Sequence, residues 1–247
     1  MESNNLQSGS ICKIASLILS NPPYDRDKHH AQTEIGHAHL AGKCSRQIWF
    51  KTHIIKEDQP SPAPVMVMGK AIHDWFDSAI EQLGEKTQIL VKQFVDFRPR
   101  WNVIGRADFV SPNSVGELKT SKAYAFKYLD APQDDHLLQS SIYAHYFQRR
   151  YIEIIYLARD TGQFKTFFWP ALRGIEAEIE RISYISTAHN PPEKVTWDGK
   201  PLEPWTAIDE EGHAKTPWQC KYCPFRMECL DLDNTLGLKI SIANIRK

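Results

Sequence analysis

Apolar residues recur with helical spacing in two segments near the start of this 247-residue chain. The first, TEIGHAHLAGKCSRQIWF at 33–50, predicts a helix with an N-capping threonine and with Cys44 near its end. The proline-rich QPSPAP at 59–64 predicts a break. A second helix is expected over VMVMGKAIHDWFDSAIEQLG at 65–84, where the final glycine provides a stop signal. Two helices therefore precede the first strand.

Short runs of strand-forming residues follow and predict a sheet. The first three runs are joined by short turns, so they are expected to form a meander. A helix is expected from about Asp134, two more strands after it, and a last helix around 171–188. This order predicts an α/β domain with a mixed sheet. The predicted strands are QILVKQFVDF (88–97), NVIGRADFVS (102–111), SVGELKTS (114–121), YIEIIYLAR and QFKTFFW.

Composition narrows the classes of function. Thirty basic and 30 acidic residues cancel, so no overall field favours nucleic acid, although a local basic groove is compatible with a neutral total. No apolar run reaches the roughly 20 residues that cross a bilayer, and the first residues lack the basic leader of a signal peptide. Five cysteines, an odd number, fit a reducing compartment better than a disulfide framework. We expect a soluble cytoplasmic protein.

The segment VGELKTSK at 115–122 places an acid and a base two positions apart in an otherwise apolar strand. Side chains alternate along a strand, so Glu117 and Lys119 project from the same side. Asp108 lies on the preceding strand, which a tight turn would bring alongside. Neighbouring carboxylates repel unless a cation lies between them, and Mg²⁺ or Mn²⁺ suits oxygen ligands. A charged lysine would orient a water or stabilise charge on a phosphate, which suits phosphodiester hydrolysis.

Two predicted helices carry polar pairs that would complete such a site. Gly69 and His73 are four residues apart and share a face, where the glycine would permit close approach and the histidine offers a nitrogen ligand. Gln139 and Tyr143 have the same spacing, and His136 lies three residues before Gln139. Each feature also has an ordinary explanation: a solvated ion pair, a hydrogen-bonded helix histidine, or an amphipathic helix face.

The order of these motifs is more specific than any one of them. G-x-x-x-H, G-R-A-D, G-E-L-K and Q-x-x-x-Y, from Gly69 to Tyr143, together resemble the PD-(D/E)XK nuclease superfamily, and specifically its RecB-like branch. The resemblance implies a restriction-endonuclease-like core, a mixed sheet flanked by helices. It also implies that a lysine assists the attacking water and that the Q-x-x-x-Y helix contributes to the active site and to DNA contact. The implied metal ligands are His73, Asp108, Glu117 and the backbone carbonyl of Leu118, and the implied catalytic residues are Asp108, Glu117, Lys119, Gln139 and Tyr143.

The cysteines form a second group. WQCKYCPFRMEC gives Cys220, Cys223 and Cys229 a C-x2-C-x5-C spacing. Soft thiolates grouped in this way bind zinc or an iron–sulfur cluster. Cys44, which stands 176 residues before Cys220, is the best candidate for a fourth ligand and would close a very long loop. Cys12 is expected to be an ordinary residue, with replacement of Cys44 as ligand the alternative.

This cysteine pattern resembles the iron–sulfur subset of RecB-like nucleases, represented by the CRISPR-associated adaptation exonuclease family (Cas protein four). In that subset one cysteine precedes the nuclease core and three follow it, and together they hold a [4Fe–4S] cluster. A C-x-R sequence followed by aromatics after the first cysteine is also typical there. The two resemblances span residues 44–229 and imply a cluster subdomain formed by the N- and C-terminal segments. A structural Zn²⁺ on four thiolates is the alternative.

Together these expectations describe a Mg²⁺- or Mn²⁺-dependent deoxyribonuclease, an exonuclease on the ends of single-stranded DNA with a structural [4Fe–4S] cluster. One alternative is a RecB-like endonuclease, or a nuclease active only within a complex of repair or CRISPR adaptation proteins. Another is a non-catalytic DNA-binding scaffold with a zinc site. The expected partners are DNA and such proteins, without a membrane. The expected boundaries are an N-terminal helical segment at 1–64, a nuclease core at 65–189 and a cysteine-rich segment at 190–247.

Basic and aromatic side chains provide candidate DNA contacts. Five basic residues near the expected site are candidates to hold the DNA backbone, and the alternative is that they are ordinary surface charge. Tryptophans of the loop 190–218 are expected to cover a cluster or fill a lid, with stacking on bases as the alternative. The basic candidates are Arg106, Lys122, Lys127, Arg149 and Arg150, and the tryptophans are Trp197, Trp205 and Trp218.

Overall fold

The computed structural model describes residues 35–53, 64–83, 88–202, 217–221 and 223–235. Within these ranges no helix has both the length and the apolar character needed to cross a membrane. The elements in chain order are β1 (Gly36–His37), the 3-10 turn η2 (Ala38–Leu40), α2 (Ser45–His53), α3 (Pro64–Leu83), β2 (Leu90–Asp96), β3 (Val103–Val110), β4 (Ser114–Ser121), α4 (Ala123–Lys127), α5 (Asp134–Tyr146), β5 (Tyr151–Ala158), β6 (Gln163–Pro170), α6 (Glu176–Thr187), α7 (Trp218–Lys221) and α8 (Arg226–Thr235).

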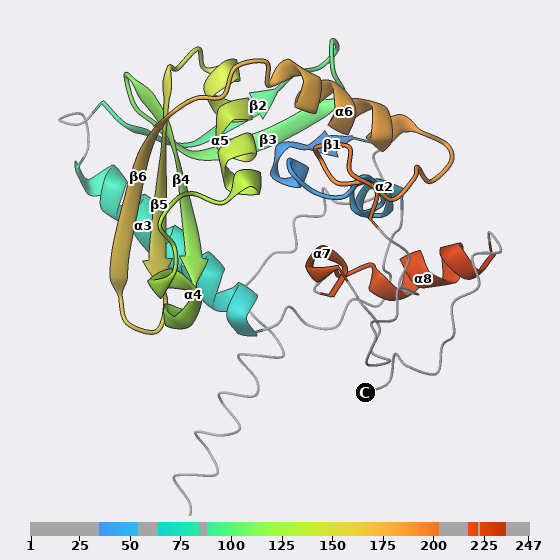
Figure 1. Cartoon of the computed structure of the whole chain (residues 1–247). Helices are drawn as coiled ribbons and strands as arrows, with labels where there is room; N and C mark the ends of the chain where they lie inside the picture. Colours follow the sequence, from blue (N-terminus) through green and yellow to red (C-terminus); the bar gives the residue numbers. More distant parts are fainter. Residues whose placement is uncertain (1–34, 54–63, 84–87, 203–216, 222, 236–247) are drawn as a thin grey trace, which may run out of the picture.

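Within the described residues six strands form one mixed sheet in the order β1-β3-β4-β5-β6, with β2 also paired to β3 (Figure 1). The strands β2, β3 and β4 pair antiparallel in succession, which confirms the predicted meander. β4 and β5 are parallel and are connected through α4 and α5, whereas β5 and β6 form an antiparallel hairpin. The α/β fold with a mixed sheet flanked by helices is thus confirmed.

The strands β3 and β4 separate soon after the turn that joins them. They pair only at Phe109 with Gly116 and at Val110 with Val115. Farther along the same edge of β3, β1 takes the place of β4 and pairs with Val103 in parallel, while β2 occupies the other edge. A gap therefore opens between β3 and β4 directly beside Asp108.

Helices cover both faces of β4. A Cβ atom at Gly69 of α3 would lie 3.7 Å from Oγ1 of Thr120, so α3 packs on the face that carries Thr120. Gln139 of α5 reaches Lys119, which lies on the opposite face. α6 packs against α2 and β1. The main core includes the buried residues Val103, Val115, Ile142, Ile152, Ile154, Ile179 and Ile182.

The predicted helix over 33–50 is wrong in its first half. Gly36 pairs with β3, and α2 begins only at Ser45, so Cys44 precedes the helix instead of lying near its end. The cause is tertiary packing, because a Cβ at Gly36 would lie 2.6 Å from the side chain of Ile182 on α6. Gly42 then turns the chain with φ of +73°, a conformation that favours glycine.

The other predicted elements are confirmed with small changes. The second helix corresponds to α3, the helix from about Asp134 to α5, and each predicted strand to one of β2–β6. The last helix starts later than expected, at Glu176, after Gly174 with φ of +70°. The short helices α4, α7 and α8 were not predicted. Residues 59–63 of the predicted break, the C-terminal tail beyond Thr235, Cys12 and Trp205 lie outside the described residues, and Pro64 is the first residue of α3.

Candidate active site and cysteine centre

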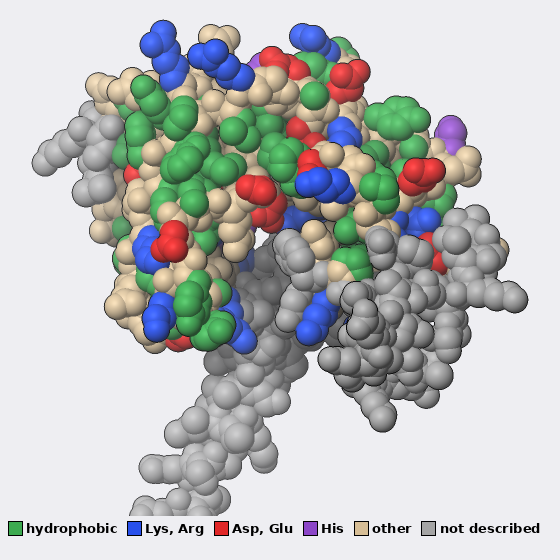
Figure 2. All heavy atoms as spheres, in the orientation of Figure 1, with side chains coloured by type: hydrophobic (Ala, Val, Ile, Leu, Met, Phe, Trp, Pro, Cys, Tyr) green, Lys and Arg blue, Asp and Glu red, His purple; other side chains and the backbone are tan. Residues whose placement is uncertain are grey.

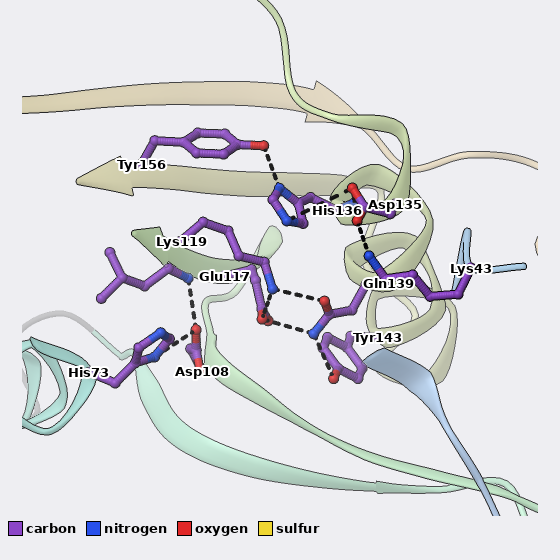
Figure 3. Close-up of polar contacts among 11 residues, drawn as sticks. Lys43, His73, Asp108, Glu117, Lys119, Asp135, His136, Gln139, Tyr143 and Tyr156 are labelled. Atoms are coloured by element: carbon purple, nitrogen blue, oxygen red, sulfur yellow. Dashed lines mark hydrogen bonds and ion pairs between the residues drawn. The ribbon is translucent and has the colours of Figure 1, made fainter. Parts of the chain in front are cut away.

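Asp108 lies where β3 and β4 separate (Figure 3). Its Oδ2 accepts a 2.7 Å hydrogen bond from the backbone N–H of Leu118, a strand donor that β3 no longer pairs. The same oxygen lies 3.4 Å from Nδ1 of His73 on α3. Burial disfavours a charged His73 ring, but Asp108 and then Glu117 raise the pKa of His73 above its ordinary value. Asp108 thus connects both strands to α3.

Four side chains form a closed polar network on the α5 face of β4 (Figure 3). Lys119 Nζ donates to Glu117 Oε1 and to Gln139 Oε1, both at 2.8 Å. Gln139 Nε2 donates to Glu117 Oε1 at 2.8 Å and to the Tyr143 hydroxyl at 3.1 Å. Because every polar atom of the Gln139 amide has a partner, the orientation of that amide is determined. Each member of the network therefore fixes the position of its neighbours.

Glu117 is buried, with 4 % of its surface exposed, and its Oε2 has no hydrogen-bond partner among the described residues. Burial, and next the negative charge of Asp108, raise the pKa of Glu117 to about 7 against the opposing effect of Lys119. A buried carboxylate oxygen without a partner is costly to maintain. A cation at Oε2 would relieve that cost and the repulsion from Asp108.

Glycines shape the site at two positions. A Cβ at Gly105 would lie 2.8 Å from the Tyr143 ring, so only glycine lets the tyrosine lie against β3. A Cβ at Gly116 would lie 1.8 Å from the Phe109 ring, which covers that strand position. Gly69 differs, because a Cβ there makes only an ordinary contact. The expected need for close approach at Gly69 is therefore wrong within the described structure.

The donor set fits a divalent cation that prefers oxygen. It consists of two carboxylates and one imidazole, and the unpartnered Oε2 of Glu117 is the available ligand atom. Within the described ranges no three His, Cys, Asp or Glu side chains already surround one point closely enough to hold an ion. Binding would therefore require His73, Asp108 and Glu117 to draw closer together, and the same holds for the cysteines described below. Leu118 contributes its N–H to the site, and its carbonyl as a metal ligand stays a prediction.

The four predicted cysteine ligands line one small cavity where α2 meets α7 and α8, which lie together in Figure 1. All four are free thiols. Burial raises the pKa of Cys220 to about 12 and also raises the pKa of Cys223 and Cys229. A metal ion would therefore have to displace thiol protons. The chemistry of four soft ligands fits zinc or an iron–sulfur cluster. The cysteines that line the cavity are Cys44, Cys220, Cys223 and Cys229.

A buried ion triad lies beside the thiols. Arg46 of α2 and Lys194 both bond to Asp233 of α8, with Lys194 Nζ at 3.0 Å from Oδ2. Asp233 is only 1 % exposed. Arg46 also donates to Sγ of Cys229 at 3.6 Å. The triad joins three distant segments of the chain and places two cations next to sulfur atoms that become negative when they bind a metal.

A cleft of about 960 Å³ lies beside the polar network and reaches Cys44 and Cys223 of the cysteine cavity. One wall is formed by the end of β4 and the start of α5, including His136, and the other includes Lys43 and Trp197. Lys43 Nζ bridges the walls by an ion pair of 2.5 Å with Asp135 Oδ2. A Cβ at Gly42 would lie 2.7 Å from Cα of Asp135, so the segment before Cys44 packs directly on α5.

The candidate DNA contacts have different surroundings. Arg106, Lys122 and Lys127 are exposed, as is Arg150. Arg149 is half-buried and donates to the carbonyls of Ser111 and Phe147, so its guanidinium stabilises the local chain. On the face drawn in Figure 2, basic and acidic side chains are interspersed among apolar ones. That face of the described residues therefore presents no broad basic surface.

Comparisons with known proteins reveal similarity of fold. No protein-family model and no curated protein matches this sequence. The crystal structure of SSO0001 aligns with a TM-score of 0.57 and 16% identity over 87% of this chain and 96% of that chain. The alkaline exonuclease LHK-Exo from Laribacter hongkongensis aligns with a TM-score of 0.45 and 11% identity, over 62% of this chain and 87% of that one. Its complex with dAMP aligns with a TM-score of 0.46 and 13% identity, over 63% and 88%. This chain and SSO0001 therefore share a fold, whereas the two exonuclease alignments are too weak to support an argument.

Some residues of both sites were not identified from the sequence. Asp233 follows Cys229 by four residues and so shares its helix face, a spacing that would have revealed it. Lys194 has no such signal, because its partner is 39 residues away. Lys43 and Asp135 likewise meet across 92 residues. Tyr156 was assigned only to a strand, although it bonds to His136.

Proposed function

We propose that this chain is a metal-dependent deoxyribonuclease that removes nucleotides from the ends of single-stranded DNA. One observation supports this proposal above all. The buried Glu117 carboxylate has one oxygen fixed by Lys119 and Gln139 and a second oxygen without a partner, next to the Asp108–His73 pair. Most buried polar atoms have a hydrogen-bond partner, and the position of this unpaired oxygen beside a second carboxylate suits a cation.

His73, Asp108, Glu117 and the Leu118 carbonyl would hold Mg²⁺ or Mn²⁺. The bound ion would polarise the scissile phosphate and lower the pKa of an attacking water. Two of the three N–H donors of Lys119 are used by Glu117 and Gln139. The third remains to position a water or to stabilise charge on a phosphate oxygen. Tyr143, whose pKa burial raises, stays a neutral hydroxyl that holds Gln139 in place.

A nuclease assay tests this proposal. Linear single strands, duplexes and circular single strands, each end-labelled or internally labelled, are incubated with Mg²⁺, Mn²⁺ or chelator. We expect metal-dependent loss of nucleotides from linear single strands and none from circles. Cleavage of circles would show that the protein is an endonuclease. Binding of DNA without any cleavage would show that it is a non-catalytic scaffold.

A matched pair of variants locates the activity. Lys119→Ala is expected to reduce cleavage by about 10²–10³-fold. Arg98→Ala, which removes a basic side chain paired with Asp96 on the turn between β2 and β3, is expected to retain it. Undiminished cleavage by Lys119→Ala would remove this lysine from the mechanism.

The second part of the proposal is a structural [4Fe–4S] cluster on Cys44, Cys220, Cys223 and Cys229. Its support is the gathering of four thiols at one cavity beside Arg46 and Lys194. Anaerobically purified protein is expected to be brown, with iron and sulfide in equal amounts. A colourless protein that contains zinc would replace the cluster with a structural zinc ion. By resemblance, the partner proteins would be those of CRISPR adaptation or DNA repair.

A further inference from the structure

His136 lies at the wall of the large cleft, next to the side chain of Lys119 (Figure 3). It is on α5, three residues before Gln139, so both side chains occupy the same helix face. Its Nδ1 lies 2.8 Å from the hydroxyl of Tyr156 on β5. His136 belongs neither to the network around Glu117 nor to the cysteine cavity. Its hydrogen bond to a buried tyrosine fixes the orientation of the ring.

The hydrogen bonds of Tyr156 determine which nitrogen of His136 carries the proton. The hydroxyl accepts the backbone N–H of Gln133 at 3.1 Å. Because Tyr156 is buried, its own proton needs an acceptor, and within the described residues Nδ1 of His136 is the acceptor in reach. Tyr156 therefore donates to Nδ1, and the imidazole proton resides on Nε2.

Nε2 of His136 has no acceptor at hydrogen-bond distance in the described part of the chain. The distance from Nε2 to Asp135 Oδ1 is 3.8 Å, and the other oxygen of that carboxylate is paired with Lys43. The ring is also neutral, because burial, followed by the positive charge of Lys119, lowers the pKa of His136 to about 3. The cleft is thus lined by a fixed, uncharged N–H donor that has no hydrogen-bond acceptor among the described residues.

We propose that His136 binds the substrate strand by donating its Nε2–H to a non-bridging oxygen of a backbone phosphate next to the scissile one. The assignment rests on the proposed nuclease function, and it adds a specific substrate contact to it. Lys119 and Lys43 flank this donor, each paired with a carboxylate, and the acceptor that a nucleic acid strand offers beside its scissile group is a phosphate oxygen.

Binding and kinetics of one variant series test the contact. Affinity for a labelled single strand is measured with Ca²⁺ in place of the catalytic metal, and KM and kcat with Mg²⁺. His136→Phe keeps the bulk of the ring and removes the donor, so we expect about 10-fold weaker binding and a raised KM with kcat changed less. His136→Gln retains an N–H donor and should recover part of the loss. His145→Gln, on the same helix but paired with Glu176, is the matched control and should behave as wild type.

Phosphate specificity is tested with strands that carry a single methylphosphonate at successive linkages. Replacement of one linkage should weaken binding to wild type and have no further effect on His136→Phe. If every linkage affects both proteins equally, the acceptor is not a backbone phosphate. If His136→Phe binds and cleaves like wild type while remaining folded, the contact does not exist.

A spectroscopic measurement tests the tautomer independently of activity. The ¹⁵N shifts of His136 should report a proton on Nε2 and no titration between pH 5 and 8. In Tyr156→Phe the fixed tautomer should be lost, with a smaller loss of DNA affinity than in His136→Phe. A proton on Nδ1 in wild type would overturn the inference.

Failure of the inference and failure of the proposed function give different results. A wild type that cleaves no DNA in any metal removes the nuclease function, and binding in Ca²⁺ still tests the His136 contact. A wild type that cleaves normally, with an unaffected His136→Phe, removes the contact alone. A wild type that neither binds nor cleaves DNA overturns both.

Discussion

The polar network around Glu117 and the cysteine cavity differ in how the chain assembles them. The network uses residues between Asp108 and Tyr143, which come from two adjacent strands and the helix that follows. The cavity instead joins the two ends of the described chain, with Arg46 and Cys229 separated by 183 residues. Local contacts cost little chain entropy to form, whereas a loop of that length costs more. The network should therefore form more readily than the cavity.

The network and the cavity also differ in how completely their own side chains provide partners for their buried polar and charged groups. In the network all described polar contacts are made without an ion, except at Oε2 of Glu117. At the cavity, buried thiols and the buried ion pairs of Asp233 lie together, and both are costly unless every partner is present. We therefore expect that removal of a metal from the proposed site at the network would leave the fold intact, whereas removal of a metal from the proposed site at the cavity would loosen it.

The strongest expected effect separates activity from stability at the network. Glu117→Gln removes the unpartnered carboxylate oxygen and is expected to reduce cleavage roughly 10⁴-fold, the upper range for a single catalytic group. Single-turnover rates and thermal melts measure the two quantities. The control is Glu180→Gln, which changes an exposed acid on α6 and should leave the rate unchanged. A rate within tenfold of wild type for Glu117→Gln would show that the network is not the active site.

The second effect concerns the triad beside the cavity. Asp233→Ala leaves Arg46 and Lys194 without their buried acid and is expected to lower the free energy of unfolding by about 3–5 kcal/mol. Urea unfolding measures the change. Asp231→Ala, on the exposed side of the same helix, should cost less than about 0.5 kcal/mol. Equal losses for the two variants would mean that the triad does not join these segments.

The third effect tests the dependence of the cavity on a metal. Cys220→Ala should abolish metal binding and remove the stabilisation that a metal at 100–1,000 times its dissociation constant gives, about 3–4 kcal/mol. The midpoint of thermal unfolding should fall by roughly 6–16 °C. Metal analysis and calorimetry measure these changes. Cys12→Ala should have neither effect. If Cys12→Ala loses the metal and Cys44→Ala keeps it, the fourth ligand is Cys12 and not Cys44.

The effect that is smallest per step of the measurement is the pH dependence of stability that His136 causes. Its pKa is about 3 in the folded protein and about 6.5 when unfolded, so the unfolded chain binds more protons between these values. Stability should therefore fall as pH drops from 6.5 towards 3, by roughly 1 kcal/mol per pH unit from this residue. His136→Gln should show a shallower slope in chemical unfolding at several pH values. Equal slopes would mean that the ring is not held neutral.

Local patterns allowed the prediction of most of the fold and of the residues of the network. The strands β2–β4 and the helix α5 follow from apolar periodicity, because their main partners are near in sequence. The first half of the predicted helix at 33–50 failed because Gly36 pairs with β3 and packs on Ile182, contacts that no local pattern contains. Lys194 was missed for the same reason. The cysteine spacing identified four thiols that line one cavity, and their role as metal ligands stays a prediction.

The separation of Arg46 from Cys229 has a consequence for biosynthesis. A ribosome makes the chain from its N-terminus, so Asp108–Tyr143 has left the exit tunnel while α7 and α8 are not yet translated. The sheet and α5 can fold in that interval, as domains do during translation. The thiols of α7 and α8 can meet Cys44 only after the strands and α5 have been made. A metal or cluster held by the four cysteines, as proposed, would therefore be loaded late, on a core that is already folded.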